Sequence, residues 1–526
     1  MKFSAQQAVL GFSFLQTLVA GSAIPRAPGT PQYFRPHGFT RRDLSVTQVQ
    51  QELGPQLSNG SLLFGPSDPR WYAAIERYST HAIPDVEIVV QPATEKDVST
   101  IVKYCNDNSI EFLAVNRGHS RSYSVAAFKG MQIDMAGLLD ITIQPDGKSA
   151  WFQGGTYDGQ VMEYLWERGY VATTGSCSCV GMMGPGLGGG HGRQEGFYGM
   201  ISDNLRNLNV VLADGTAVRV NSTSHADLLW GMKGAGHNFG IVTSFELNIY
   251  PREVDSWHYH TYTWKGDKLD TVINALNKLH GNGTTPVNMA VNFGSFLLNT
   301  SVSTTEASLW WTFGYKGTAE EANKVLKPFN DIGAEYEEFG DVPYPQISDM
   351  QGTGIGGPLC AKNASHTTST VNLLTYNLTA ERQIYNRFSD WIKEYPELGP
   401  TAQIVHEGYS TEAVDKFPAD DSAFPFRADR HLMLFDVQIP TENPRGINFT
   451  TVAREWAQEV QTMWNEGQPT RIPGAYVNYA NSLEGPKMWY GHEQWRQDRL
   501  LALKKKYDPQ NRFRFYNPIV SEATTA

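Results

Sequence analysis

The most constraining feature of this sequence is a glycine-rich stretch at residues 173–199, TTGSCSCVGMMGPGLGGGHGRQEGFYG. Glycine loses more conformational freedom on folding than any other residue, so such a stretch predicts backbone that turns sharply or lies flat against another group. Two of the four cysteines in the chain, Cys177 and Cys179, fall inside it. A thiol in such a loop indicates either a closely held, covalently bonded cofactor or a surface loop closed by a disulfide.

The length of the chain limits the number of its domains, and its charge limits the kinds of partner that it can bind. The 526 residues are enough for about three domains or fewer. The net charge of −11 argues against nucleic acids and anionic membranes as partners. The only basic run is the short one at residues 504–506. We therefore expect a globular monomer that acts on a small molecule.

The N-terminus has the pattern of a secretory signal peptide over residues 1–23. Lys2 supplies the positive start, residues 9–20 are apolar, and the small residues Gly21 and Ala23 precede the expected cleavage point. The apolar run is shorter than the ~20 residues that span a membrane. Residues 24–45 are rich in proline, glycine and arginine, so we expect a poorly ordered mature N-terminus and a secreted, extracellular protein.

Sequons and cysteines are consistent with export. Cys105, Cys177, Cys179 and Cys360 allow three full pairings, and the sequence does not choose among them. The expected sites of N-glycosylation are the seven N-x-S/T sequons without proline, at Asn59, Asn221, Asn282, Asn299, Asn363, Asn377 and Asn448.

From residue 87 onward, short strands alternate with helices. Thr94 is a candidate cap for a helix over residues 95–109, and LRNLNVVLADGTAVRV predicts a hairpin that turns at Asp214 and Gly215. No G-x-G-x-x-G follows the first strand, which argues against a Rossmann domain. We assign residues 80–253 to one α+β domain.

The composition changes near residue 254. SWHYHTYTW, PVNMAVNFGSFLL and ASLWWTFGYKG alternate and are rich in aromatic and β-branched residues, which predicts an antiparallel sheet. Helical segments lie between and after these strands. We assign residues 254–470 to a second domain, a sheet with helices on one face. Residues 471–520, expected to hold a strand, a loop and a helix, are read as completing the first domain.

A second motif that could bind a ligand is VNRGHSRS at residues 115–122. Backbone N–H groups at a Gly/Ser turn can hold phosphate oxygens, and hydroxyl groups and an arginine add donors. By itself the motif fits an ordinary polar turn equally well.

The order of these motifs resembles the flavin-binding domain of the vanillyl-alcohol-oxidase/PCMH superfamily, in its berberine-bridge-enzyme-like branch. The matching segments include VVQPATEKDVSTIVKYC, VNRGHS, GSCSCVGMMGPGLGGGHG, DLLWGMKGAGHNFGIVTSFEL and KYDPQNRFRFYNPI. The likeness is close over residues 80–255 and good over 470–520. It implies an α+β fold, with a PCMH-type FAD-binding domain of two α/β subdomains plus a substrate domain whose antiparallel sheet is covered by helices.

The resemblance implies FAD bound through two covalent bonds. His119 falls where the histidine of the family bonds to the 8α-methyl group of the flavin, and Cys177 falls where its cysteine bonds to flavin C6. Cys179 has no counterpart in the family, so either thiol remains a candidate. The family has two glycines before the histidine, where this chain has Arg117 and Gly118. The other residues that the resemblance places at FAD are Arg117, Gly118, Ser120, Val180, Gly181, Gly184, Gly188, Gly189, Gly190, Gly192, Tyr198, Ile241, Val242 and Asn478.

The resemblance also implies a catalytic pair. Tyr479 matches the active-site tyrosine of the family, and Asp421 aligns with an acid that serves as base or as tyrosine partner in relatives. A free tyrosine has a pKa of about 10, so it needs such a partner to accept a proton at neutral pH.

The sequence therefore predicts a secreted FAD-dependent oxidase that is reoxidised by O₂ to give H₂O₂. Three hypotheses for its substrate remain: oxidation or oxidative cyclisation of a specialised metabolite, oxidation of an oligosaccharide at its anomeric carbon, or a catalytically silent glycoprotein on the same scaffold. No metal-ligand spacing and no G-x-S-x-G motif of a serine hydrolase occurs, so we expect no metal.

Overall fold

The computed structural model describes residues 45–281 and 283–520. The expected signal peptide, residues 24–44 of the expected disordered segment, and Asn282 lie outside the described residues. The first described element is α1 (Val46–Leu53), where the side chain of Ser45 accepts a hydrogen bond from the backbone of Gln48 and so caps the helix.

The first sheet has the strand order β1-β2-β4-β3, with β2, β4 and β3 parallel. Helix α3 connects β2 to β3, as the alternating pattern predicted, and Thr94 and Asp97 form a capping box at its N-terminus. The elements are β1 (Leu62–Phe64), α2 (Trp71–Ile75), β2 (Asp85–Gln91), α3 (Glu95–Asp107), β3 (Phe112–Val115) and β4 (Lys129–Asp134).

The second sheet is antiparallel and has the order β5-β6-β10-β8-β9. The predicted hairpin joins β8 to β9, and Gly215 supplies the positive φ of +82° that its turn requires. The elements are β5 (Ile141–Ile143), β6 (Ser149–Gln153), α4 (Asp158–Glu167), β7 (Tyr170–Val171), α5 (Met183–Gly186), α6 (Glu195–Tyr198), β8 (Leu205–Val211), β9 (Ala217–Asn221), α7 (Ala226–Ala235), β10 (Ile241–Asn248) and β11 (Tyr250–Pro251).

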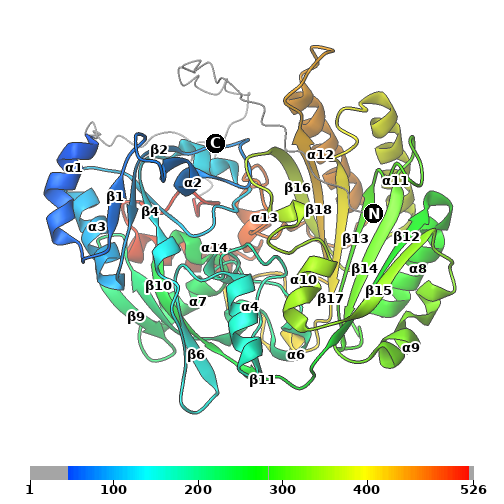
Figure 1. The fold of residues 1–526 in the computed structure, drawn as a ribbon, viewed down its shortest axis with the longest axis horizontal. Coiled ribbons are helices and arrows are strands. Elements are labelled where there is room, and N and C mark those ends of the chain that lie inside the picture. Colours follow the sequence, from blue (N-terminus) through cyan, green and yellow to red (C-terminus); the bar gives the residue numbers. More distant parts are fainter. Residues whose placement is uncertain (1–44, 282, 521–526) are drawn as a thin grey trace, which may run out of the picture.

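The third sheet has seven antiparallel strands in the order β15-β12-β14-β13-β17-β18-β16. Helices α8, α9, α11 and α12 cover one face of this sheet, and the opposite face looks toward the first part of the chain (Figure 1). The elements are β12 (Trp257–Lys265), α8 (Leu269–His280), β13 (Met289–Leu297), β14 (Ser308–Tyr315), α9 (Ala319–Asn330), β15 (Tyr336–Val342), α10 (Ile347–Met350), β16 (Ser365–Leu373), α11 (Leu378–Glu394), β17 (Gln403–Tyr409), β18 (His431–Ile439) and α12 (Phe449–Glu466).

The C-terminal segment folds back onto the first part of the chain. It contains α13 (Pro486–Tyr490) and α14 (Gln494–Tyr507). Lys504 donates from Nζ to the carbonyl of Asn238, and Arg514 forms an ion pair with Glu111 at 2.6 Å. The prediction of a strand around Tyr479 was wrong. A turn forms there, in which the N–H groups of Tyr479 and Ala480 donate to the carbonyl of Tyr476.

The predicted α+β class, with an antiparallel sheet covered by helices, is confirmed. Sequence reasoning missed strands β15, β16 and β17 and helix α12. No helix within residues 45–281 and 283–520 has the length and apolar character needed to cross a membrane.

Candidate active site

A large cavity lies between the first two sheets and the uncovered face of the seven-stranded sheet. Its walls come from the turn after β3, the glycine-rich stretch, the start of β10, strands β13, β17 and β18, and the C-terminal segment. The predicted residues that line it are Arg117, Gly118, His119, Ser120, Cys177, Val180, Gly181, Gly184, Ile241, Val242, Asn478 and Tyr479. Segments far apart in the sequence therefore meet at one site.

The turn at residues 117–121 has the properties of an anion cradle. Within the part of the chain that the structure describes, the backbone N–H groups of these five residues donate to no protein acceptor. Gly118 has a φ of +68°, and a Cβ there would lie 2.8 Å from the carbonyl of Glu76. Free N–H groups beside an arginine fit the oxygens of a phosphate or pyrophosphate, the kind of group that such a turn can hold.

The structure distinguishes the two cysteines of the glycine-rich stretch. Cys179 forms a disulfide with Cys360, which precedes β16, and their Cα atoms are 5.9 Å apart. Cys177 is a free thiol that faces the cavity. Burial, reinforced by the nearby Glu407 carboxylate, raises the pKa of Cys177 to about 12. Of the two candidates for flavin attachment, only Cys177 has a sulfur that is not already bonded.

Four of the predicted flavin-contacting glycines do not line the cavity. An added Cβ at these positions would meet protein atoms, so close packing of the chain on itself accounts for these glycines, and their contact with the flavin ring stays a prediction. The nearest protein atom is 2.2 Å away in Asn478 for Gly188, 2.8 Å in Phe424 for Gly189, 2.7 Å in Ile201 for Gly190, and 1.8 Å in the carbonyl of Thr174 for Gly192.

Tyr198 is also packed against the protein itself. Its ring stacks on Tyr250 with centroids 3.7 Å apart and planes at 4°, and it does not line the cavity. Tyr198 therefore packs against β11, and its contact with the cofactor stays a prediction.

The acidic partner of Tyr479 is Glu407, not Asp421. The hydroxyl of Tyr479 donates to the carboxylate of Glu407 at 2.8 Å, and both side chains line the cavity. Asp421 is exposed and lies in a loop away from the cavity. Burial raises the pKa of Glu407, although hydrogen bonds from Tyr479 and Tyr409 oppose this. Burial and the adjacent carboxylate raise the pKa of Tyr479 well above its ordinary value.

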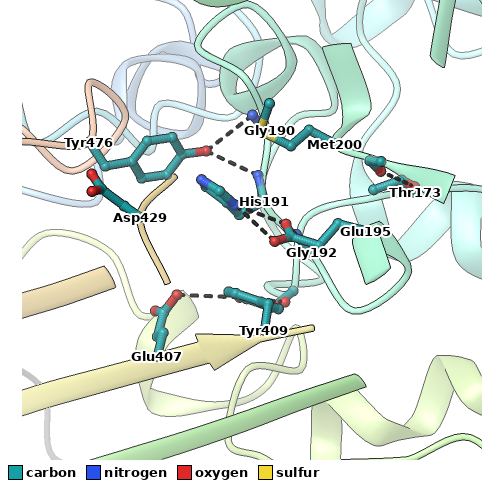
Figure 2. A network of polar contacts seen from close by, with 12 residues as sticks. Thr173, Gly190, His191, Gly192, Glu195, Met200, Glu407, Tyr409, Asp429 and Tyr476 are labelled. Carbon is teal, nitrogen blue, oxygen red and sulfur yellow. Dashed lines mark hydrogen bonds and ion pairs between the residues drawn. The ribbon is translucent and has the colours of Figure 1, made fainter. Parts of the chain in front are cut away.

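His191 forms a second polar group on the cavity wall, next to the Glu407 cluster (Figure 2). Its Nδ1 lies 2.9 Å from Oε2 of Glu195, and the hydroxyl of Tyr476 accepts hydrogen bonds from the backbone of Gly190 and His191. Burial lowers the pKa of His191, but the Glu195 carboxylate more than offsets this, so its pKa ends above the ordinary value. Tyr409, which donates to Glu407 at 3.3 Å, connects the two clusters.

The sheet face that closes the cavity carries four apolar and three polar side chains. Alternate side chains of β13, β17 and β18 point into the cavity, because successive residues of a strand face opposite sides. The polar groups on this face are Gln403, Glu407 and Tyr409 on β17. The apolar ones are Val291, Phe293, Val405 and Leu434.

Sequence reasoning missed Glu407, Tyr409 and His191 as site residues. The available signal was the stretch QIVHEGY, where Glu407 and Tyr409 share one strand face while His406 points to α11 and pairs with Glu381 at 2.8 Å.

The sequons differ in how available their amide groups are. Asn59, Asn363 and Asn448 are exposed, and Asn299 is half-buried. The Nδ2 group of Asn377 donates to the carbonyl of Gly467 at 3.0 Å, and that of Asn221 donates to Asn207 at 2.8 Å. The Nδ2 group of the exposed Asn363 also donates, to the carboxylate of Glu76 at 3.2 Å. A glycan on any of these three nitrogens would replace a hydrogen bond of the fold.

Comparison with known proteins places the chain in a family. Residues 86–221 match the model of an FAD binding domain, and residues 475–520 match the model described as berberine and berberine like. The FAD-linked oxidoreductase anuG of Penicillium roqueforti is 54% identical over 481 residues, which cover 91% of this chain and 94% of that protein. The chain belongs to the berberine-bridge-like family of FAD-linked oxidoreductases.

A second curated relative is similar over most of its length, and two solved structures share the fold. The FAD-linked oxidoreductase OXR2 of Pyricularia oryzae is 51% identical over 494 residues, covering 93% of this chain and 95% of that protein. Among solved structures, the xylooligosaccharide oxidase of Myceliophthora thermophila superposes with a TM-score of 0.75 at 17% identity, covering 91% of this chain and all of that one. The glucooligosaccharide oxidase of Acremonium strictum, described with a 6-S-cysteinyl, 8α-N1-histidyl FAD, has a TM-score of 0.73 at 20% identity and covers 90% and 99%.

The berberine-bridge-like enzyme described here therefore binds FAD and catalyses an oxidation–reduction. The cavity fits this cofactor. The N–H groups at residues 117–121 can hold a pyrophosphate. Ile241 and Val242, at the start of β10, form an apolar part of the cavity wall. His119 and Cys177 provide two nucleophilic side chains on the same cavity.

Proposed function

We propose that this enzyme is a secreted oxidase that holds FAD through His119 and Cys177, oxidises a specialised metabolite and transfers the electrons to dioxygen, giving H₂O₂. The observation that carries the proposal is the convergence of His119, Cys177 and the Tyr479–Glu407 pair on one cavity. FAD, when bound, supplies the acceptor of two electrons from the substrate.

Glu407 and Tyr479 supply the proton acceptor. Because burial and the carboxylate hold the pKa of Tyr479 well above 10, its hydroxyl stays protonated at neutral pH. In the proposed step, the substrate's O–H or N–H proton moves to the oxygen of Tyr479 while the proton of Tyr479 moves to Glu407. The carboxylate is thus the base, and the tyrosine orients the substrate and relays the proton.

The apolar side chains of the sheet face support a specialised metabolite as the substrate. Val291, Phe293, Val405 and Leu434 offer few hydrogen-bonding partners for a polyhydroxylated ligand, because a buried hydroxyl without a partner is costly. The alternative, an oligosaccharide oxidase, is favoured by the names of several proteins that share the fold, such as the chitooligosaccharide oxidase, which superposes with a TM-score of 0.72 at 20% identity. A third alternative is a catalytically silent glycoprotein.

One screen separates these functions. The enzyme is mixed with cello-, chito- and xylo-oligosaccharides and, in parallel, with a panel of aromatic and polyketide compounds. Flavin bleaching is followed without oxygen and peroxide release with oxygen. Bleaching and peroxide with the apolar panel are expected. A response to sugars alone would establish the alternative oxidase, and no bleaching with either panel would favour the silent protein.

Covalent attachment is tested on the denatured chain. The wild-type polypeptide should remain yellow and flavin-fluorescent after denaturation, and His119→Ala and Cys177→Ala should each retain one bond. A colourless denatured chain with all FAD in the supernatant would contradict the attachment. Loss of both bonds in a single variant would show that one attachment depends on the other.

Export and glycosylation form part of the same proposal. Expression in a secreting host should deliver the chain, cleaved near residue 23, to the medium as a monomer. Glycosidase treatment should lower its mass, with glycans expected first at the exposed Asn59, Asn363 and Asn448. An uncleaved chain retained in the cells would contradict this part of the proposal.

A further inference from the structure

Three aromatic rings from distant parts of the chain form one stack beside the cavity. The ring of Tyr78 lies between His119 and His366, with centroids 4.2 Å from each and interplanar angles of 23° and 20°. Tyr78 precedes β2, whereas His366 lies on β16 of the seven-stranded sheet. One face of the His119 ring therefore packs on Tyr78, and the opposite face of Tyr78 packs on His366 of the seven-stranded sheet.

A buried carboxylate fixes this stack. Asp436 on β18 accepts hydrogen bonds from the hydroxyl of Tyr78 at 3.1 Å, from Arg121 at 2.9 Å and from Nδ1 of His366 at 2.8 Å. Arg121 also donates to the hydroxyl of Tyr78 at 3.1 Å. Charge-assisted hydrogen bonds of this kind hold side chains in defined orientations. Tyr78 and His366 are thus each held both by stacking and by the same carboxylate.

The edge of His119 is held as well. Its Nε2 lies 3.2 Å from the carbonyl oxygen of Leu359, and a carbonyl oxygen only accepts hydrogen bonds. Nε2 therefore carries the proton, which leaves the lone pair on Nδ1. Leu359 is kept in place because the next residue, Cys360, is bonded to Cys179, whose sulfur lies 3.7 Å from the same Nε2.

The electrostatic surroundings keep the ring uncharged. Burial, reinforced by the positive charge of Arg121, lowers the pKa of His119 to about 3. An uncharged imidazole with a lone pair on a defined nitrogen is a nucleophile, whereas an imidazolium is not.

We propose that Tyr78, supported by His366 and Asp436, is a positioning residue that directs Nδ1 of His119 to the flavin's 8α-methyl group for bond formation. This inference rests on the proposed function, because it needs FAD in the cavity. Attachment replaces one C–H bond of the methyl group by a C–N bond. The two electrons released would pass to the flavin ring and then to dioxygen, and the methyl proton and the Nε2 proton of His119 would be taken up by that dioxygen to give H₂O₂.

The test uses Cys177→Ser as the background, so that any flavin on the denatured chain reports only the bond to His119. In this background Tyr78→Leu, which removes the ring, should lower the fraction of chains with flavin on the His119 peptide at least fivefold, as measured by mass spectrometry. Tyr78→Phe keeps the ring and should stay within twofold of the background. FAD released on denaturation should rise in Tyr78→Leu by the amount that the covalent fraction falls.

Tyr262→Leu is the matched control. Tyr262 stacks on His260 with centroids 4.1 Å apart, is buried and does not line the cavity, so its loss should lower thermal stability without changing the covalent fraction. If Tyr78→Leu binds no FAD at all, the test uses His366→Leu, which removes only the ring on the far side of Tyr78. In that variant the covalent fraction should fall at least twofold.

The inference would be overturned if the covalent fraction were unchanged in Tyr78→Leu. If Tyr78→Leu binds no FAD, an unchanged covalent fraction in His366→Leu would overturn it. Failure of the proposed function looks different, because the wild-type chain itself would then carry no covalent flavin after denaturation.

Discussion

The hydroxyl of Tyr479 lies 2.8 Å from Oε1 and 3.0 Å from Oε2 of Glu407, across 72 residues of sequence. The tyrosine comes from the C-terminal segment, and the carboxylate comes from β17 of the seven-stranded sheet. The C-terminal segment and the seven-stranded sheet are therefore joined at the cavity by the pair that we propose accepts the substrate's proton.

This pair gives the first prediction. Glu407→Gln should lower turnover about 10²–10⁴-fold, since an amide cannot accept the proton. Because burial raises the pKa of Glu407 above its ordinary value, the wild-type rate should fall as the pH drops through that raised pKa. The control is Asp421→Asn, which changes an exposed loop residue and should keep the wild-type rate. A large loss in Asp421→Asn with a normal rate in Glu407→Gln would restore the original assignment.

The second prediction concerns the glycines. A Cβ at Gly192 would lie 1.8 Å from the backbone carbonyl of Thr174, so Gly192→Ala should destabilise the fold by about 1–3 kcal/mol or more. No atom lies within 4 Å of a Cβ at Gly184, which lines the cavity, so Gly184→Ala should unfold like the wild type in a chemical denaturation series. Equal stability of the two variants would show that Gly192 is not needed for packing.

The third prediction concerns the disulfide. Alkylation of the denatured, unreduced chain should leave Cys179 and Cys360 unlabelled until a reductant is added. Cys360→Ala should lower the free energy of unfolding by about 2–4 kcal/mol, because the bond closes a long loop. Reductant should lower the melting temperature of the wild type but not that of Cys360→Ala. Labelling of Cys179 without reduction would contradict the pairing.

The fourth prediction follows from two buried histidines behind the seven-stranded sheet. Burial lowers the pKa of His280 to about 4 and, together with the neighbouring His280, lowers that of His431 well below 6.5. Between pH ~6.5 and 4 the unfolded chain therefore binds more protons than the folded one, and stability falls with falling pH by up to about 1.4 kcal/mol per unit and per histidine.

His431→Phe tests this relationship directly. Neither ring nitrogen of His431 has a hydrogen-bond partner among the described residues, and its ring stacks on Tyr376 at 4.0 Å, so phenylalanine can replace it. The variant should show a smaller loss of stability between pH 6.5 and 5 in urea titrations. An unchanged pH slope would mean that burial does not lower the pKa of His431 in the folded state.

Local sequence determined much of this protein. Thr94 and Asp97 cap the start of α3, and the turn at Asp214 and Gly215 pairs β8 with β9. The residues around His119 and Cys177 identified the flavin domain. These features depend on neighbours in the chain or on short motifs, so they can be read without the fold.

Only the tertiary structure decided the partners of those residues. Glu407 reaches Tyr479, Cys179 bonds Cys360, and Tyr78 lies between His119 and His366 because sheets and loops far apart in the sequence pack around one cavity. The same holds for Gly188 and Gly192: the sequence indicated that something must lie close to them, and the packing showed that it is the protein itself. Which side chain meets another is set by long-range packing, and no local pattern records it.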